Sequence, residues 1–229
     1  MKPKTVVVVG ASRGIGKSMI DLLAKDSDLK ILALSRNVER MNQHFSNYSN
    51  VECHELDLNS ESVREDCIKI FSNVDSIDYL INNAGYLVNK PFMELTQDDL
   101  RDCYSVNVIS VIQTVQAVLD KMEAGHIVNI SSIGGFQGSV KFPGLTAYST
   151  SKAALCSFTE LFAEEYKESN IKMNCLALGA AQTEMLEEAF PGYEAPISAE
   201  KMADYIVNFT LTAHEWMNGK IIPVSLSTP

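Results

Sequence analysis

The amino-acid sequence predicts an α/β protein whose parallel β-sheet carries helices on both faces. Short runs rich in Val, Ile and Leu alternate with longer amphipathic segments along all 229 residues, as in folds built from strand–helix–strand units. The first run, Val6–Val9, is apolar at every position, which is typical of a central strand covered on both faces. No repeat or linker-like stretch divides the chain, so we expect one domain over residues 1–229.

Seven short apolar runs bounded by turn residues are expected to form the strands of a parallel seven-stranded sheet. They are Thr5–Val9, Ile31–Leu34, Val51–Leu56, Ile77–Ile81, His126–Ile130, Met173–Leu178 and Lys220–Val224. Helical spacing of apolar residues predicts five helices between them, the second with Ser60 as its N-cap. They are Ile15–Lys25, Ser60–Phe71, Thr96–Met122, Thr146–Tyr166 and Ser198–Leu211.

Composition excludes several classes of protein. The 19 Lys and Arg residues against 29 Asp and Glu residues give a net charge of −10, which argues against nonspecific binding of nucleic acid or an anionic membrane. No apolar run approaches the roughly 20 residues of a membrane span. The five cysteines are dispersed, so we expect reduced thiols in a cytoplasmic protein, and neither they nor the four histidines show metal-ligand spacing.

A glycine-rich turn follows the first strand directly, with the sequence Gly10-Ala11-Ser12-Arg13-Gly14-Ile15-Gly16. Glycines at such a turn allow a sharp change of direction, close approach of the backbone to a pyrophosphate, and tight packing of the next helix. The free N–H groups at that helix N-terminus would bind the phosphates of a dinucleotide. A tight turn without a ligand is the alternative reading of the same residues.

The second strand is expected to end at Ser35-Arg36, where dinucleotide sites select between the two nicotinamide cofactors. A carboxylate at this position binds the ribose 2′-hydroxyl of NAD(H), whereas Arg suits the 2′-phosphate of NADP(H). Arg36, together with Arg13 in the turn, therefore favours NADP(H), with NAD(H) possible. The alternative is that Arg36 is only a solvated loop residue.

Further motifs occur in a fixed order along the chain. Asn82-Asn83-Ala84-Gly85 follows the fourth strand, Asp57-Leu58 follows the third, Ser131-Ser132 closes the fifth, and Tyr148 precedes Lys152 by four residues. With the glycine-rich turn and Asn107 in the long helix, these motifs make the chain resemble the short-chain dehydrogenase/reductase family over essentially its whole length. The resemblance implies a doubly wound Rossmann-type fold.

The resemblance also implies a role for each catalytic candidate. Tyr148 would be the general acid/base, Lys152 would lower its pKa and hold the nicotinamide ribose, Ser132 would polarise the substrate carbonyl, and Asn107 would complete the proton relay. The residue chemistry agrees, because Tyr148 and Lys152 share one helix face, and an ammonium favours a phenolate. Asn107 is a poor helix former that needs a reason to lie mid-helix. The cofactor would contact Gly10, Ser12, Arg13, Gly14, Ile15, Gly16, Ser35, Arg36, Asp57, Leu58, Asn83, Ala84, Gly85, Tyr148, Lys152, Gly179 and Thr183.

Two segments depart from the family pattern. Gly179 and Thr183 are kept after the sixth strand, but Leu178 replaces the usual Pro, which loosens the turn. The substrate loop, about residues 180–197, is short. The interval from Ser132 to Tyr148 is slightly long, with the extra length in residues 138–145, and we expect that loop to shape the substrate pocket.

The expected activity is NADP(H)-dependent interconversion of a carbonyl and a secondary alcohol in a small molecule. Gly134, Phe142, Leu145 and Met185 are the candidate substrate contacts, and together they form an apolar pocket. The alternative is a non-catalytic NADP(H)-binding sensor or scaffold on the same fold. The two long helices carry apolar residues on more than one face, which predicts a homodimer or homotetramer. These residues are Val106, Ile109 and Ile112 on one helix and Cys156, Thr159 and Ala163 on the other.

Overall fold

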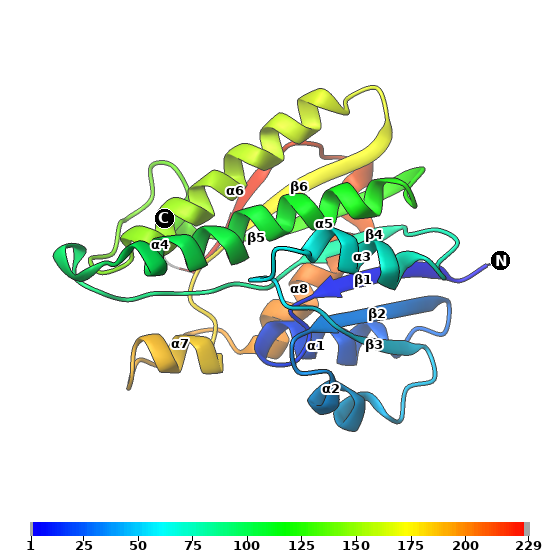
Figure 1. Cartoon of the computed structure of the whole chain (residues 1–229), viewed down its shortest axis with the longest axis horizontal. Coiled ribbons are helices and arrows are strands. Elements are labelled where there is room, and N and C mark those ends of the chain that lie inside the picture. The colour runs from blue at the N-terminus through cyan, green and yellow to red at the C-terminus, as the bar shows by residue number, and fades with distance from the viewer. Residues whose placement is uncertain (1, 227–229) are drawn as a thin grey trace.

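The structure is a computed structural model that describes residues 2–226; of the domain expected over 1–229, residues 1 and 227–229 lie outside this range. Seven parallel strands form one sheet in the order β3-β2-β1-β4-β5-β6-β7 (Figure 1), which confirms the predicted fold class. The strands are β1 (Lys4–Val9), β2 (Leu29–Ser35), β3 (Val51–Glu55), β4 (Tyr79–Asn82), β5 (Ala124–Ser132), β6 (Asn170–Leu178) and β7 (Ile221–Val224).

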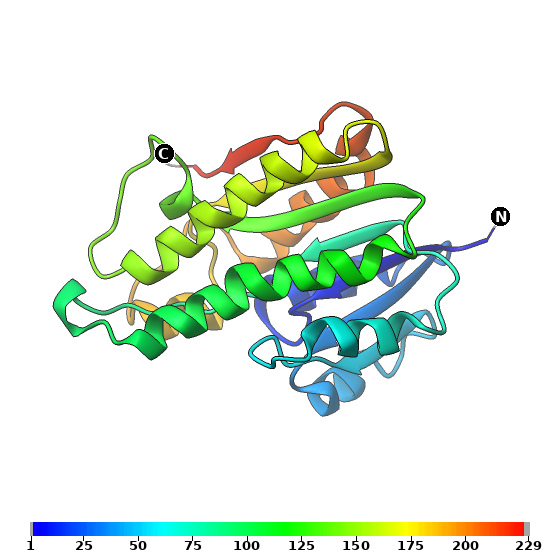
Figure 2. The same cartoon turned by 45° about the horizontal axis from the view of Figure 1, so that its top comes forward.

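Helices cover both faces of the sheet (Figures 1 and 2). In β1, Val6 and Val8 pack with α1, α2 and α8, whereas Val7 and Val9 pack with α3, α5 and α6. The unbroken apolar run of β1 is explained by this alternation, because each face of the strand meets its own helix layer. The helices are α1 (Gly14–Leu23), α2 (Val38–Phe45), α3 (Val63–Phe71), α4 (Gln97–Tyr104), α5 (Ser110–Leu119), α6 (Thr146–Glu165), α7 (Glu184–Ala189) and α8 (Ala199–Thr212).

Three helical features differ from the sequence-based expectation. Helices α2 and α7 were not predicted, and α3 begins three residues after Ser60, with Ser62 at its N-cap position. The long helix expected over Thr96–Met122 is divided by one π-helical turn, Ser105–Ile109, between α4 and α5. Its predicted start is right, because Thr96 forms a capping box with Asp99.

Chain order and spatial order diverge beside β1, since β2 lies on one side of it and β4 on the other. Connections leave β1 and β4 toward opposite faces of the sheet, which opens a crevice beyond their carboxyl ends. No helix within residues 2–226 is both long and apolar enough to cross a bilayer.

A buried histidine lies within the sheet, and we expect it to make stability depend on pH. His126 is fully buried, its Nδ1 lies 2.9 Å from the Thr210 carbonyl oxygen, and its Nε2 lies 2.9 Å from Nδ2 of Asn174. The amide can only donate, so Nε2 accepts and Nδ1 carries the proton that is donated to Thr210. Burial, more than the neighbouring His214, lowers the pKa of His126 to about 4.

The unfolded chain, with an ordinary histidine pKa of about 6.5, binds this proton more readily than the folded protein does. Stability is therefore complete above pH 6.5 and falls as the pH drops toward 4. We expect urea unfolding to show a loss of about 2 kcal/mol between pH 7.5 and pH 5 from this residue. His126→Asn should reduce that loss, and His44→Asn at an exposed position should retain it; equal pH dependence in all three proteins would contradict the assignment.

Candidate active site

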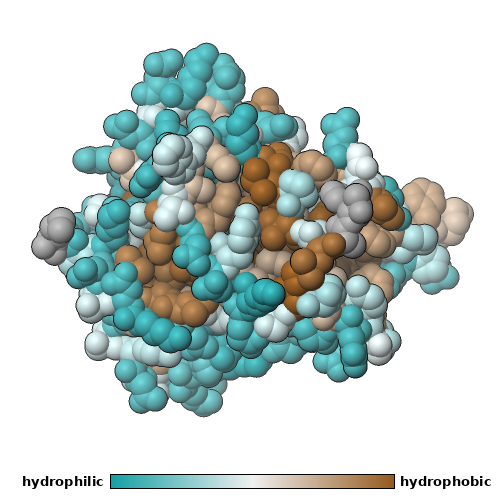
Figure 3. Space-filling model, turned by 180° about the vertical axis from the view of Figure 1, so that it is seen from behind, coloured by the Kyte–Doolittle hydropathy of each residue, from teal (hydrophilic) through white to brown (hydrophobic). Residues whose placement is uncertain are grey.

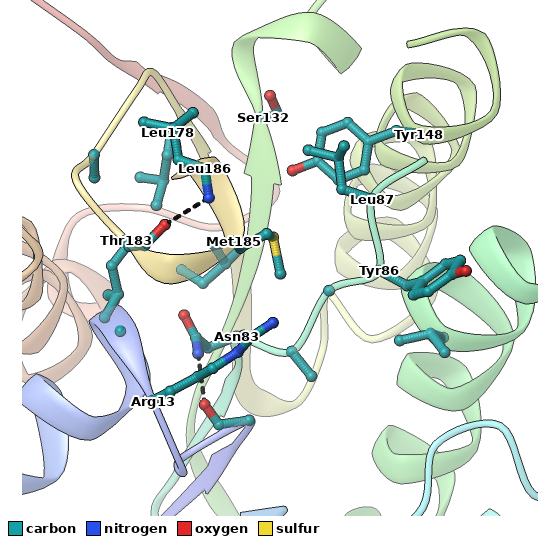
Figure 4. A pocket seen from close by; sticks show the side chains of 18 of the residues that line it. Arg13, Asn83, Tyr86, Leu87, Ser132, Tyr148, Leu178, Thr183, Met185 and Leu186 are labelled. Carbon is teal, nitrogen blue, oxygen red and sulfur yellow. Dashed lines mark hydrogen bonds between the residues drawn. The ribbon is translucent and has the colours of Figure 1, made fainter. Parts of the chain in front are cut away.

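A cavity of about 550 Å³ lies at the carboxyl ends of β1, β2, β5 and β6 (Figure 4). It contains most of the residues predicted from the sequence to bind cofactor or substrate. Those that line it are Gly10, Ser12, Arg13, Gly14, Ile15, Ser35, Arg36, Asp57, Leu58, Asn83, Ala84, Gly85, Ser132, Phe142, Leu145, Tyr148, Lys152, Gly179, Thr183 and Met185. Three predicted residues do not line it, namely Gly16, Asn107 and Gly134.

The glycine-rich turn packs too closely for side chains. Gly10 has φ +86°, and a Cβ added there would lie 2.7 Å from the backbone nitrogen of Ala84. A Cβ on Gly16 would lie 1.9 Å from the Gly10 carbonyl oxygen. Gly16 therefore does not line the cavity; its lack of a side chain lets α1 pack closely against the Gly10 backbone.

The N-terminus of α1 opens onto this cavity with groups suited to a phosphate. Among residues 2–226, no side chain caps the helix, and its first turn carries no acidic residue, so its first N–H groups have no carboxylate cap in this part of the chain. The Asn83 side chain donates to the Gly10 carbonyl oxygen at 3.0 Å, which joins the ends of β4 and β1. The backbone, free N–H groups and open glycine surface fit the pyrophosphate of a dinucleotide.

The two arginines predicted to read the 2′-phosphate differ in their surroundings. Arg36 is exposed at the end of β2 and forms no ion pair with any residue in 2–226. Arg13 instead donates to both carboxylate oxygens of Glu188 in α7, at 2.6 and 3.2 Å. Ser35 donates to Ser12 at 2.8 Å and joins the end of β2 to the turn.

Adjacent serines at the end of β5 face different surroundings. The Ser131 hydroxyl donates to the Lys152 carbonyl oxygen at 2.8 Å and is buried against α6. The Ser132 hydroxyl accepts from Gly134 N at 3.2 Å and is near enough to Tyr148 to lower the pKa of its hydroxyl. Of the two serines, Ser132 is therefore the one beside Tyr148, whose hydroxyl points into the cavity in Figure 4.

Tyr148 and Lys152 lie one turn apart on α6. The Lys152 ammonium is 5.9 Å from the centre of the Tyr148 ring and donates to the Ile130 carbonyl oxygen at 2.7 Å. Burial raises the pKa of Tyr148 to about 12, with the nearby Ser132 hydroxyl opposing the rise, and burial lowers the pKa of Lys152 to about 8. We expected Lys152 to lower the Tyr148 pKa; among this chain's own groups the shift has the opposite direction, because desolvation of the phenolate dominates.

Asn107 lies in the π-helical turn and is fully buried behind the cavity. Its side-chain oxygen accepts from Tyr86 N at 2.8 Å, and its amide donates to the Tyr86 carbonyl oxygen and to Ser151 Oγ, each at 2.9 Å. π-helical turns often mark functional positions. Here the turn directs Asn107 toward the segment that follows β4, where it fixes the backbone of Tyr86.

Apolar side chains surround the part of the cavity beside Tyr148. Phe142, Leu145 and Met185 were expected there, but Gly134 packs against Ser149 instead, with only 2.8 Å between an added Cβ and Ser149 Oγ. The sequence-based prediction missed Tyr86, Leu87 and Val106, whereas Leu186, Phe190 and Tyr193 lie in the substrate loop that was expected near residues 180–197. A usable signal existed for some of them, because Tyr86 and Leu87 directly follow Asn82-Asn83-Ala84-Gly85.

Lys152 is the charged side chain of the cavity that lies at Tyr148, and the other charged residues come from the segments around the glycine-rich turn and the start of α7. Arg13, Arg36, Asp57 and Glu184 belong to the turn, the ends of β2 and β3, and the start of α7, whereas Lys152 lies beneath Tyr148. Within residues 2–226, no three His, Cys, Asp or Glu side chains gather at a spacing suited to a metal ion.

Comparison with known proteins identifies the class of protein that this fold and site define. The short chain dehydrogenase family model matches residues 4–194. The chain is 30% identical to the 3-oxoacyl-[acyl-carrier-protein] reductase of Aquifex aeolicus, over 98% of this chain and 97% of that protein. It is 34% identical to carbonyl reductase family member 4 of Xenopus tropicalis, over 80% and 77% of the two chains.

Solved structures agree with the fold. A short chain dehydrogenase from Burkholderia cenocepacia, in complex with NADP, superimposes with a TM-score of 0.87 at 24% identity over 98% of this chain and 97% of that one. ElxO with NADP bound gives 0.84 at 27% identity, over 98% and 97%. The chain belongs to the short chain dehydrogenase family. It is an oxidoreductase that acts on CH–OH or C=O groups.

Proposed function

We propose that this protein is an NADP(H)-dependent oxidoreductase that interconverts a carbonyl and a secondary alcohol, with Tyr148 as general acid/base. The observation that carries the proposal is the position of the Tyr148 hydroxyl, beside Ser132 and one helical turn from Lys152, in a cavity that continues to the glycine-rich turn. The NADP-bound relatives support the choice of cofactor. The alternative, a non-catalytic NADP(H)-binding sensor or scaffold, does not require this set of side chains.

When bound, the nicotinamide supplies or accepts the hydride at the substrate carbon. In reduction, Tyr148 donates its proton to the carbonyl oxygen while Ser132 donates a hydrogen bond to the same oxygen. Lys152 would hold the nicotinamide ribose and, by its charge, would stabilise the phenolate that remains. Asn107 acts behind them by fixing the backbone at Tyr86.

The substrate is a small, uncharged carbonyl compound with apolar substituents. Aliphatic and aromatic side chains surround the Tyr148 hydroxyl, and the charges of the cavity other than Lys152 lie on the cofactor side. A charged substrate group would lose its hydration there without gaining a partner. Residues 1–229 act as one binding and catalytic domain, with the substrate loop near 180–197.

We further propose a homodimer or homotetramer, with a correction to some of the residues expected at the contact. Cys156, Thr159 and Ala163 are buried inside their own chain. Ile109, which was expected at the contact, is 50% exposed in the π-helical turn, and Leu161 on α6, which was not expected there, is 67% exposed. Apolar residues also reach the surface in patches on the face seen from behind (Figure 3), and burying such patches favours association.

Binding of the two nicotinamide cofactors tests the proposal before any substrate is known. Arg36 offers a guanidinium without an ion-pair partner in residues 2–226, and a charge-assisted hydrogen bond is worth about 1.5–3 kcal/mol. We expect nicotinamide fluorescence titrations to give a Kd for NADPH at least about tenfold below that for NADH.

Two variants make the cofactor test specific. Arg36→Ala should weaken NADPH binding and leave NADH binding unchanged, whereas Arg64→Ala, an exposed arginine on α3, should change neither. Tighter binding of NADH would overturn the cofactor preference, and binding of neither would overturn the proposed function.

A further inference from the structure

The ion pair between Arg13 and Glu188 joins the glycine-rich turn to a helix 175 residues away in sequence. Both terminal nitrogens of Arg13 donate to the two carboxylate oxygens of Glu188. This end-on geometry is the one an arginine uses for a phosphate. The carboxylate of Glu188 therefore occupies the donors that a cofactor 2′-phosphate would take.

A second carboxylate of α7 lies on the same side of the cavity. Oε2 of Glu184 is 3.4 Å from the position of a Cβ added at Gly14, and Oε1 lies 3.7 Å from a terminal nitrogen of Arg40 on α2. The first residue of α7 and its fifth thus both direct negative charge toward cations at the cofactor end. Met185 and Leu186, between them, line the cavity.

We propose that Glu188 is a selectivity-determining residue, whose carboxylate competes with the 2′-phosphate of NADP(H) for Arg13 and so reduces the preference for NADP(H) over NAD(H). The inference rests on the proposed function. NADPH must displace Glu188 from Arg13 or leave its 2′-phosphate beside a like charge, and both cost binding free energy. NADH carries a hydroxyl at this position and leaves the pair intact.

Helix α7 has contacts at both ends besides this pair. The Thr183 side chain caps its start by accepting from Leu186 N, and Asn89 donates to the Ala189 carbonyl oxygen at its end, at 3.0 Å. Glu188→Gln keeps the size of the side chain and removes only its charge. Cofactor choice can therefore change without loss of the helix.

The test measures equilibrium Kd values for NADPH and NADH by nicotinamide fluorescence. Exposed ion pairs contribute up to about 1 kcal/mol, so Glu188→Gln should tighten NADPH binding about three- to fivefold and leave NADH binding unchanged. Glu187→Gln is the matched control, since it removes the same charge from a neighbouring exposed position of α7 that has no ion pair within residues 2–226. It should change neither Kd.

A double variant isolates the pair itself. In an Arg13→Ala background, Glu188→Gln should alter the NADPH Kd less than it does in the wild-type background, because the competition for Arg13 has been removed. If Glu188→Gln changed the Kd values for NADPH and NADH equally, Glu188 would act by holding α7 in place and not by selecting the cofactor. If neither Kd changed, the ion pair would be a surface contact only. Either result overturns the inference. A wild-type protein that binds neither cofactor fails the proposed function instead, so the two failures are distinguishable.

Discussion

Replacing Tyr148 by Phe should lower kcat for carbonyl reduction by about 10²- to 10⁴-fold, the range that general acid catalysis contributes. The substitution removes the hydroxyl that points into the cavity and keeps the ring that packs there (Figure 4). Since the ring is retained, the Kd for NADPH should stay within about twofold of wild type. The rate would be followed as NADPH oxidation with the best neutral ketone or aldehyde found in a screen.

The raised pKa of Tyr148 determines how the rates of reduction and oxidation depend on pH. With its pKa raised to about 12, Tyr148 is protonated at neutral pH and ready to donate a proton, which favours reduction. Oxidation of the alcohol requires the phenolate, so its rate should rise with pH in the wild-type protein. Tyr148→Phe should abolish this rise along with the activity.

Tyr166→Phe is the matched control, because Tyr166 stacks on Phe162 at the other end of α6. It should retain wild-type kcat. A Tyr148→Phe protein that retains more than about a tenth of the wild-type kcat would remove Tyr148 from the role of general acid, given the 10²-fold minimum expected. Loss of NADPH binding in the same variant would instead indicate a structural role for the hydroxyl.

The sequence predicts the central strands well because β1, β2 and β4 are short, mostly apolar runs bounded by turn residues. All seven strands are present, and their ends differ from the prediction by three residues at most, as for β6, which begins at Asn170 and not at Met173. The Tyr148–Lys152 pair was equally predictable, since spacing of four on a helix fixes a shared face. Arg36 and Asp57 were also predictable as cavity residues, because each follows the carboxyl end of a parallel strand.

The two unpredicted helices are short and polar. Helix α2 has a narrow apolar stripe of Val38, Met41 and Phe45, at spacings of three and four residues, in a segment of only eight residues. Helix α7 buries none of its residues fully and is held by the Thr183 cap and by contacts from distant segments. Asn37 and Thr183, each a good N-cap residue, were further local signals for these helices.

Tertiary contacts account for the remaining differences. The residues around Glu188 in the sequence do not predict its ion pair with Arg13, because the pair depends on how α7 is placed next to the glycine-rich turn. Gly134 was assigned to the substrate pocket from its position after β5, yet the 3₁₀ turn Ile133–Gly135 directs it toward Ser149. The rise in the Tyr148 pKa likewise depends on burial, which spacing along a helix does not report.

Gly16→Ala should weaken NADPH binding by about tenfold or more and destabilise the fold, because it disrupts both the turn and the helix N-terminus that faces the phosphates. The new Cβ would lie 1.9 Å from the Gly10 carbonyl oxygen and 2.7 Å from Nδ2 of Asn83. The clash is with backbone, so it is relieved only by moving α1 away from the turn.

Overpacking of this kind costs about 1–3 kcal/mol, and the better helix propensity of Ala recovers about 1 kcal/mol at most. In Gly16→Ala, the free energy of unfolding from urea titrations should therefore fall, and the Kd for NADPH should rise. Lys17→Ala, the next residue of α1, loses only a surface pair with Asp21 and should change stability by less than about 0.5 kcal/mol. If Gly16→Ala matched wild type in both measurements, α1 would not need to approach the turn as closely as the structure places it, and the glycine would be explained by sequence history and not by packing.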